Sequence, residues 1–212
     1  MRVAIRDSMW WVPPEQAVWV PAGISHEVSV EQAMAMRTLY VHPDAARELL
    51  HSCCVVPVRS LLRELIIEAS RSFDGYGPAT PQARLAAVIL DELRRLHPEP
   101  LHLPMPRDKR LRVITDGLTA KPTDSRTLEE WSQPAGASAR TLARRFREET
   151  GITFGRWRQR LRVLSATTRL GAGDPVTMVA YDLGYSSPSA FIATFKRSFG
   201  SSPARYFRAS NR

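Results

Sequence analysis

The chain has too few cysteines for a disulfide-stabilised fold. Its two cysteines, Cys53 and Cys54, are neighbours, and neighbouring cysteines rarely bridge because the bond needs well-separated Cβ vectors. This excludes a disulfide-rich secreted scaffold and predicts a reducing compartment. Apolar runs of the roughly 18 to 20 residues that span a membrane are also missing, as are the basic, apolar and small-residue regions of a signal peptide. We therefore expect a cytoplasmic protein with no membrane partner.

Acidic residues are scarce in the second half of the chain. Residues 107–212 hold nine Asp or Glu against twenty Lys or Arg, whereas residues 1–106 hold twelve against ten. The second half thus carries a net charge of +11 and the first half −2. Nucleic acid is the commonest polyanion that binds a strongly basic folded domain. The alternative is that the arginines only solvate a helical surface.

Catalytic and metal-binding patterns are missing as well. His42, His51, His97 and His102 do not have the spacing of metal ligands, which usually number three or four. No nucleophile with a partnered base is evident in the sequence. We expect no catalytic residue, no metal, no cofactor and no enzymatic activity.

The length of 212 residues exceeds one average domain and predicts two. Short alternating patterns over residues 3–41, including QAVWVPAG and AMRTLYV, favour short strands and turns. Apolar residues then recur at helical spacing over residues 58–73 and 85–96, with a turn expected at 74–81. The first half is therefore predicted to be a β part followed by two antiparallel helices.

Prolines separate this half from the rest of the chain. Their positions exclude a helix or a central strand and predict a linker at residues 98–106, between domains at 1–97 and 107–212: Pro98, Pro100, Pro104 and Pro106. Beyond residue 107 the pattern is helical throughout, and we expect seven helices.

Cap signals occur at intervals in the helical half. Thr127 to Glu130 has the pattern of a capping box. Asp174 is expected to cap a later helix, with Pro175 at its first position. Ser-Pro pairs at Ser187 and Ser202 predict two further helix starts.

One segment of the helical half occurs twice. SARTLARRFREETG at residues 138–151 has a counterpart in SPSAFIATFKRSFG at residues 187–200. Ser opens each copy, Phe follows eight residues later, and Gly closes it five residues after that. Each copy follows a short helix and a turn that contains Gly136 or Gly184. This is the helix-turn-helix pattern, which places its second helix in the major groove of DNA.

Helical spacing divides each copy into an inward and an outward face. In the first copy Ala139, Leu142 and Phe146 are expected to pack inward, and the outward face is largely cationic: Arg140, Ala143, Arg144 and Arg147. Arg140 and Arg144 would make most of the hydrogen bonds to base edges, since Arg to guanine is the most frequent specific contact.

The second copy carries fewer long polar side chains. Phe191 and Phe195 are expected to pack inward, and the outward set is Ser189, Ile192, Ala193 and Lys196. It would contact DNA through hydroxyls, methyl groups and shape. The alternative is that this unit is only a packing partner.

Residues 154–170 predict an amphipathic helix that connects the two copies. Its apolar face holds Trp157, Leu161, Leu164 and Thr168, and Arg158, Arg162 and Arg169 lie on another face, where we expect nonspecific attraction to DNA. At about 1.5 Å per residue the helix spans roughly 25 Å, a length suited to two recognition helices about 34 Å apart. The repeat therefore predicts one monomer that contacts two successive major grooves.

These segments together resemble the DNA-binding domain of AraC/XylS-family bacterial transcription regulators, over about residues 107–208. The residues that match the family signature in order are Ala180, Gly184, Tyr185, Ser187, Phe191, Phe195, Lys196, Gly200, Pro203 and Tyr206. The resemblance implies a sequence-specific regulator whose partners are double-stranded DNA and RNA polymerase. It also implies a small-molecule effector, since many members respond to one through an N-terminal domain. It leaves open the operator, the effector and whether transcription rises or falls.

The first half resembles the late part of a cupin barrel, whose second motif contains Pro21, Gly23 and His26 here. The earlier H-x-H motif is not found, so residues 1–97 are expected to form a truncated cupin-like domain for effector binding or dimerisation. An open sheet edge would favour pairing with another chain. The helix at residues 58–73 would either help to form a homodimer or cover the barrel.

The expected fold class is α+β, a partial cupin-like domain with two helices followed by an all-α domain with two helix-turn-helix units. DNA contacts are expected from Ser138, Arg140, Thr141, Ala143, Arg144, Arg147, Ser186, Ser187, Ser189, Ala193 and Lys196. The N-termini of the helices capped by Thr127 and Ser138 would face phosphates. An effector pocket would use Trp11, Trp19 and His26, with core packing as the alternative for the tryptophans.

Two residues depart from the family pattern in the first unit. Pro134 lies at the end of the leading helix, where its ring removes a backbone donor, and is expected to shorten that helix. Ser132 stands where the family generally has Ala. Both changes would loosen the first unit.

Two other function classes remain open on the sequence. A cupin enzyme with an accessory nucleic-acid domain would be revealed by metal analysis. An architectural protein that coats DNA without sequence preference would be revealed by competition with random duplex at fixed salt.

Overall fold

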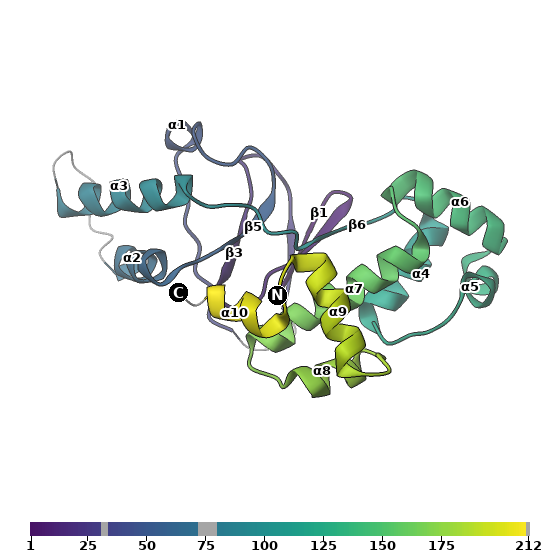
Figure 1. Cartoon of the computed structure of the whole chain (residues 1–212). Coiled ribbons are helices and arrows are strands. Elements are labelled where there is room, and N and C mark those ends of the chain that lie inside the picture. The colour runs from purple at the N-terminus through teal and green to yellow at the C-terminus, as the bar shows by residue number, and fades with distance from the viewer. Residues whose placement is uncertain (31–33, 72–79, 211–212) are drawn as a thin grey trace.

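The structure is a computed structural model that describes residues 1–30, 34–71 and 80–210. Its β part lies between two groups of helices (Figure 1). The first half contains β1 (Arg2–Ile5), β2 (Ser8–Trp11), β3 (Gln16–Trp19), β4 (Glu27–Ser29), α1 (Pro43–Ala46), β5 (Cys54–Pro57), α2 (Ser60–Arg71) and α3 (Pro81–Arg94). After β6 (His102–Pro104) come α4 (Lys109–Ala120), α5 (Leu128–Ala135), α6 (Ala139–Thr150), α7 (Phe154–Gly171), α8 (Val176–Asp182), α9 (Pro188–Phe199) and α10 (Pro203–Ser210). The expectation of seven helices is confirmed for the described residues 107–210.

Two small antiparallel sheets form the β part. One has the strand order β4-β1-β2-β6, and the other pairs β3 with β5. In β1 the side chains of Val3 and Ile5 are buried, while those of Arg2 and Ala4 are half-buried. This alternation is what a strand with one face on a core requires. The short strands expected in this region are confirmed as far as Ser29.

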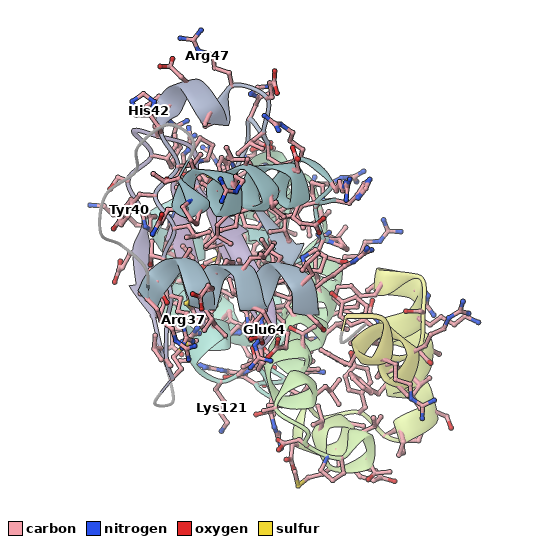
Figure 2. All side chains as sticks on the ribbon, turned by 90° about the vertical axis from the view of Figure 1, so that its left-hand side faces the viewer. Arg37, Tyr40, His42, Arg47, Glu64 and Lys121 are labelled. Atoms are coloured by element: carbon pink, nitrogen blue, oxygen red, sulfur yellow. The ribbon has the colours of Figure 1, made fainter. Side chains whose placement is uncertain are left out.

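The strand expected from AMRTLYV is wrong. Residues 35–41 form no strand, and Met36 and Tyr40 are 58% and 96% exposed. Figure 2 shows Tyr40 at the outer surface of the first half. Alternation alone does not make a strand, because a strand needs a neighbour for its backbone hydrogen bonds. Leu39 instead packs against the helices α2 and α3.

The two helices expected in the first half are confirmed as α2 and α3. They pack on each other around Leu62, which is 2% exposed, together with Ile89 and the half-buried Leu65 and Ile66. These side chains therefore pack within the helix pair. The turn expected at residues 74–81 lies mostly outside the described residues.

The proline-rich segment packs into the structure as an edge strand. β6 pairs with β2 at the edge of the larger sheet, in agreement with the exclusion of a central strand by proline. Leu101, Leu103 and Met105 are at most 3% exposed, and the Trp11 amide donates to the Leu101 carbonyl over 2.9 Å. The segment belongs to a core, and a domain boundary at residues 98–106 stays a prediction.

Apart from the small core between α2 and α3, the described residues form two larger cores, which we call the first and the second core. The first core joins the sheets to α4, α5, α6 and the first part of α7, so that Val3 and Trp11 share it with Ile114 and Phe146. The second core lies among α7, α8, α9 and α10 and includes Phe191. Helix α7 runs through both cores (Figure 1).

Helix α5 runs through Pro134 and ends at Ala135. The expectation that Pro134 shortens it stays a prediction, since the helix ends one residue after the proline with both ends capped. The capping box is confirmed: the Thr127 amide donates to Glu130 Oε2 over 2.7 Å, and the Glu130 amide donates to Thr127 Oγ1 over 3.3 Å. At the other end the Gly136 amide donates to the Gln133 carbonyl. This bond caps the last turn, where the proline ring has removed a backbone donor.

Helix α8 begins one residue later than expected. Pro175 occupies the cap position, and no side chain caps the helix. The Asp174 carboxylate instead accepts from Arg169 Nε over 2.8 Å. The expected cap by Asp174 is therefore wrong, because an ion pair engages its carboxylate.

Candidate nucleic-acid interface

Helix α6 presents a cationic face because its apolar side chains point inward. Leu142 and Phe146 are 1% and 0% exposed. The Phe146 ring packs edge-on against Phe154 and Trp157, with centroids 5.6 Å apart in both pairs. The four residues expected on the outward face are all exposed: Arg140, Ala143, Arg144 and Arg147. The predicted division of the first copy into two faces is confirmed.

Ser138 caps α6 as expected. The Thr141 amide donates to Ser138 Oγ over 3.3 Å, and the two side-chain hydroxyls lie 3.0 Å apart. Ser138 is exposed and Thr141 is half-buried. The N-terminal end of a helix favours an anion, because its first amides are not bonded within the helix and its dipole is positive there.

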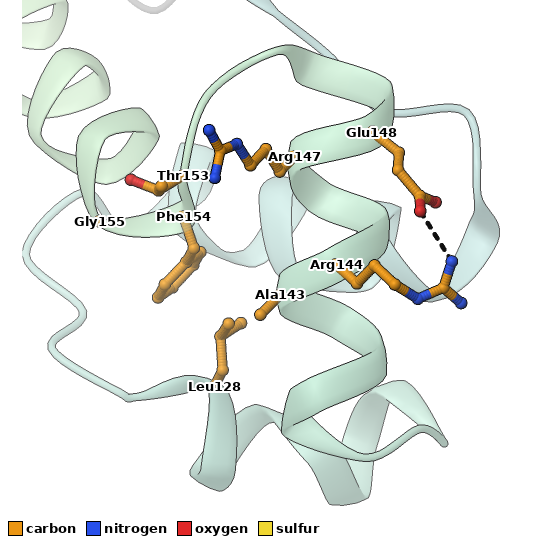
Figure 3. Close-up of a pocket in the computed structure, with 8 residues that line it drawn as sticks. All are labelled: Leu128, Ala143, Arg144, Arg147, Glu148, Thr153, Phe154 and Gly155. Carbon is orange, nitrogen blue, oxygen red and sulfur yellow. Dashed lines mark hydrogen bonds and ion pairs between the residues drawn. The ribbon is translucent and has the colours of Figure 1, made fainter.

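Sequence reasoning missed a carboxylate on the outward face of α6. Arg144 Nη1 donates to Glu148 Oε1 over 2.7 Å (Figure 3). The side chains are 60% and 48% exposed, so the pair contributes at most about 1 kcal/mol. Their spacing of four residues on a helix could have revealed it. Among the described residues, neither Arg140 nor Arg147 has an ion-pair partner.

A hollow of about 760 Å³ lies beside this face, lined by Leu128, Ala143, Arg144, Arg147, Glu148, Thr153, Phe154 and Gly155. In Figure 3 Arg147 extends from α6 towards Thr153 and Gly155 at the start of α7. Thr153 caps α7 by accepting from the Arg156 amide over 3.4 Å. A guanidinium beside a helix N-terminus is an arrangement that favours a phosphate.

Helix α9 repeats the arrangement with less charge. Phe191 and Phe195 are both 0% exposed, and Ser187 caps the helix by accepting from the Ala190 amide over 3.2 Å. The outward residues of the second copy are exposed, apart from the half-buried Ser187: Ser186, Ser189, Ile192, Ala193 and Lys196. The expected faces are confirmed for this copy too.

Gly136 and Gly184 form the turns of the two units, as expected. Their φ angles are 65° and 77°, in the left-handed region that glycine adopts without steric cost. Each turn therefore depends on its glycine.

Two arginines of the connecting helix anchor the α4–α5 loop. Arg158 Nη1 donates to the carbonyls of Ser125 and Arg126 over 3.1 and 2.9 Å. Arg162 Nε donates to the carbonyl of Pro122 over 2.9 Å. These bonds hold the loop that precedes the first helix-turn-helix unit against α7.

Arg169 has a similar structural role at the other end of α7. It donates to the carboxylates of Asp174 and Asp182, over 2.8 Å in both cases. Arg158, Arg162 and Arg169 thus stabilise the fold, and the nonspecific attraction to DNA expected from them stays a prediction.

Of the three residues expected to line an effector pocket, one lines the cavity beside the strands. A cavity of about 890 Å³ lies among the strands, α2, α7 and α8, and Trp11 is one of its lining residues, whereas Trp19 and His26 are not. Trp19 Nε1 donates to the Leu50 carbonyl over 2.6 Å. His26 is exposed, and its Nδ1 lies 3.1 Å from the Ile24 carbonyl oxygen. An effector site that uses all three stays a prediction.

Cys53 and Cys54 are free thiols, and burial raises the pKa of Cys54 to about 11. Across the described ranges, no three His, Cys, Asp or Glu side chains are grouped so that they could hold a metal ion. Of the helices in the described part of the chain, none is both long and apolar enough to cross a membrane.

Comparison with known proteins places the chain among transcription regulators. A family described as a helix-turn-helix domain matches residues 131–209. The HTH-type transcriptional regulator NimR of Escherichia coli strain K12 is 34% identical over 202 residues, which are 95% of this chain and 74% of NimR. An AraC-like transcription regulator of Streptomyces antibioticus is 28% identical over 92% of this chain and 56% of its own length.

One solved structure that resembles the chain is the DNA-binding domain of the transcriptional factor AdpA in complex with a target DNA. It is 35% identical, covers 48% of this chain and 92% of its own, and superposes with a TM-score of 0.44.

Proposed function

We propose a mode of DNA binding for this chain, which belongs to the AraC/XylS family of DNA-binding transcription regulators. Its two helix-turn-helix units enter successive major grooves of one operator. The observation that carries this proposal is the exposure of both outward faces. On α6 that face holds Arg140, Arg144 and Arg147, and on α9 it holds Ser189 and Lys196. Both helices rest on buried phenylalanines, so their faces are held rigidly.

The first unit would supply most of the base discrimination. Arg140 and Arg144 are exposed, and a guanidinium can donate two hydrogen bonds to guanine O6 and N7. Arg147 extends towards the start of α7, where a backbone phosphate would meet both a cation and a helix N-terminus. In this arrangement α6 provides base contacts at its centre and a phosphate contact near its C-terminal end.

The second unit would add contacts through hydroxyl and methyl groups and through shape complementarity to the groove. Ser186 and Ser189 can donate to phosphates or bases, while Ala193 and Ile192 present methyl groups that suit a thymine C5-methyl. Lys196 would contact the backbone as a point charge. A regulator with these two units depends on the first for discrimination and on the second for affinity.

We further propose the partners that the family resemblance implies: RNA polymerase, a second copy of the chain and a small-molecule effector. The β4 edge is compatible with a homodimer, since Glu27–Ser29 are exposed at the edge of the larger sheet. The proposal places the protein in the cytoplasm and assigns it no enzymatic activity.

The function is tested by selecting bound duplexes from a random library and then measuring affinity for every single-base variant of the selected site. We expect one position at which Arg144→Ala removes about 1 to 3 kcal/mol of base preference. The matched control is Arg94→Ala, since Arg94 also forms a surface pair on its own helix, with Asp91 over 2.7 Å, but lies on α3. The assignment of Arg144 fails if the preference at every position survives its removal.

A second arm of this experiment addresses nonspecific coating of DNA. Random duplex is added as competitor at fixed salt, because phosphate attraction alone supplies little base discrimination. A specific regulator stays on its selected site, whereas an architectural protein is displaced in proportion to competitor length.

A further inference from the structure

The two helix-turn-helix units are attached to the first half of the chain in different ways. Leu142 and Phe146 of the first unit lie in the same core as the strand residues Val3 and Trp11. The second unit has its own core, which contains no strand residue among those that the structure describes, although the half-buried Phe199 of α9 packs against both cores. The position of the second unit relative to the first therefore depends on α7, on the contact of Phe199 with the first core and on surface contacts with the sheets.

One of these contacts is a polar cluster around Tyr206, in α10. Gln16 Nε2 donates to the Tyr206 hydroxyl over 3.3 Å, and that hydroxyl donates to Glu99 Oε2 over 3.2 Å. Tyr206 is 7% exposed, and burial raises its pKa above the ordinary value, so the hydroxyl remains a donor. We call Gln16, Glu99 and Tyr206 the Tyr206 cluster.

Both partners of Tyr206 are fixed to the smaller sheet. Gln16 is the first residue of β3 and pairs with Pro57 of β5. The Glu99 amide donates to the Val55 carbonyl of β5 over 2.7 Å. The Tyr206 cluster therefore links α10, the helix that follows the second helix-turn-helix pair, to two points on the smaller sheet, 190 and 107 residues away in sequence.

A second contact of the same interface lies at the end of α7. A Cβ atom on Gly171 would meet Pro14 Cδ at 3.0 Å and Pro13 Cβ at 3.5 Å. The loop between β2 and β3 thus touches α7 where the second unit begins. Any side chain at residue 171 would have to displace this loop or tilt the unit.

We propose that Tyr206, Gln16 and Glu99 are positioning residues that fix the second helix-turn-helix unit on the first half of the chain and so set the spacing between DNA half-sites that the protein accepts. The proposal rests on the proposed function. The sheets are joined to the first unit through the shared core, so an attachment of the second unit to a sheet also fixes it relative to the first. Loss of this attachment leaves α7 and the Phe199 contact as the connections between the two units, and it permits neighbouring half-site spacings.

The experiment uses the full chain and the two half-sites selected with the unaltered protein. Affinity is measured for the selected spacing and for duplexes with one base pair added or removed between the half-sites. In Tyr206→Phe we expect discrimination between spacings to fall about fivefold, the factor that corresponds to one hydrogen bond. The aromatic core should persist in this variant, because the ring still packs on Phe195, Phe199 and Phe207.

Three further variants separate positioning from general stability. Glu99→Leu should relax the spacing as Tyr206→Phe does, whereas Glu99→Gln, which keeps an acceptor oxygen, should restore it. Gly171→Ala should shift the preferred spacing or relax it. Tyr185→Phe is the matched control, since Tyr185 packs on Phe191 within the same core, and it should leave the spacing unchanged.

The outcomes distinguish this proposal from the proposed function. If Tyr206→Phe and Glu99→Leu keep the full discrimination between spacings, the positioning role is overturned while the function stands. If the unaltered protein selects no paired half-sites, both are overturned.

Discussion

At the scale of single residues, the contact between Gly117 and Trp131 shows how one missing side chain supports the first unit. A Cβ atom on Gly117 would lie 2.7 Å from Trp131 Cη2. Trp131 is 3% exposed, and the Arg126 guanidinium lies 3.6 Å from the centroid of its ring. The indole is therefore enclosed between α4 and a cation and cannot move aside freely.

We predict that Gly117→Ala destabilises the protein by about 1 to 3 kcal/mol, because overpacking outweighs the gain of about 1 kcal/mol in helix propensity. Urea unfolding measures the change. The matched control is Gly155→Ala in α7, where nothing lies within 4 Å of the added Cβ, and this variant should be slightly more stable. Equal effects of the two substitutions would show that Trp131 yields to the methyl group.

Residue spacing predicted the faces of α6 and α9 correctly because burial follows helical periodicity. The Arg144–Glu148 pair could also have been predicted from its spacing. The bonds of Arg158 and Arg162 could not, since their acceptors are backbone carbonyls 32 to 40 residues away and every residue carries a carbonyl. Which carbonyls accept these bonds depends on the path of the α4–α5 loop in the folded protein.

At the scale of elements, the N-terminus of α4 is stabilised by charged groups that are close in sequence. Asp108 caps α4 by accepting from the Arg110 amide over 2.9 Å, and Arg110 Nη2 donates to its other oxygen over 2.6 Å. Hydrogen bonds from the Arg110 side chain are the main reason that the pKa of Asp108 falls to about 2, from an ordinary value of 3.8. The folded state thus favours the ionised carboxylate.

A lowered pKa in the folded state means that this stabilisation is present above about pH 4 and is lost as the pH falls towards 2. Asp108→Asn keeps a cap acceptor but removes the charge. We predict that the variant is less stable than the unaltered protein at pH 6, by no more than about 1 kcal/mol, because the Arg110 side chain of the pair is exposed to solvent. Urea titrations between pH 6 and pH 3 should show the difference shrinking. A constant difference over that range would refute the assignment.

Elements with a strong period or cap were predictable, and those defined by long-range pairing were not. The helices from α4 to α10 and the capping box at Thr127 follow from local sequence. β5 was not predicted, because four residues of CVVP have no period that separates a strand from a helix. The strand expected at residues 35–41 had the right alternation but found no pairing partner among the described residues. Local sequence patterns are enough to predict helices, whereas a strand forms only where another strand can pair with it.

At the scale of the whole molecule, the first and the second core differ in the spectroscopic signals that detect their unfolding. All five tryptophans lie between residues 10 and 157, and Trp11, Trp131 and Trp157 belong to the first core. The second core contains no tryptophan, although α8, α9 and α10 contribute to the helical signal. Tryptophan fluorescence and circular dichroism therefore observe different parts of the protein.

We predict that the two signals do not change together on urea unfolding. Helicity should begin to fall at a lower urea concentration than tryptophan fluorescence changes, because the second core is the smaller one. Tyr206→Phe should widen the gap, since it weakens the attachment of the second unit by about 1 kcal/mol. Coincident transitions in both proteins would mean that the two cores unfold as one cooperative unit.

The fold class and the double helix-turn-helix architecture were predictable at this scale, because the repeat and the charge asymmetry are both visible in the sequence. The sharing of one core between the sheets and the first unit was not. Prolines are frequent in exposed linkers, and for this reason residues 98–106 were predicted to be one. Leu101 and Leu103, however, are buried at alternate positions, as in an edge strand.

The buried course of residues 101–105 bears on how this protein could be recombined with its relatives. A chimaera joined at residue 106 would bring Leu111, Ile114 and Leu118 against foreign strands, since these side chains pack in the same core as Val3 and Leu103. A graft with its crossover inside α7, after Leu164 and before Ala166, leaves the first core whole and separates only Val163 from the buried residues of the second. Only the second helix-turn-helix unit is then exchanged, and the first unit stays with the strands on which it packs.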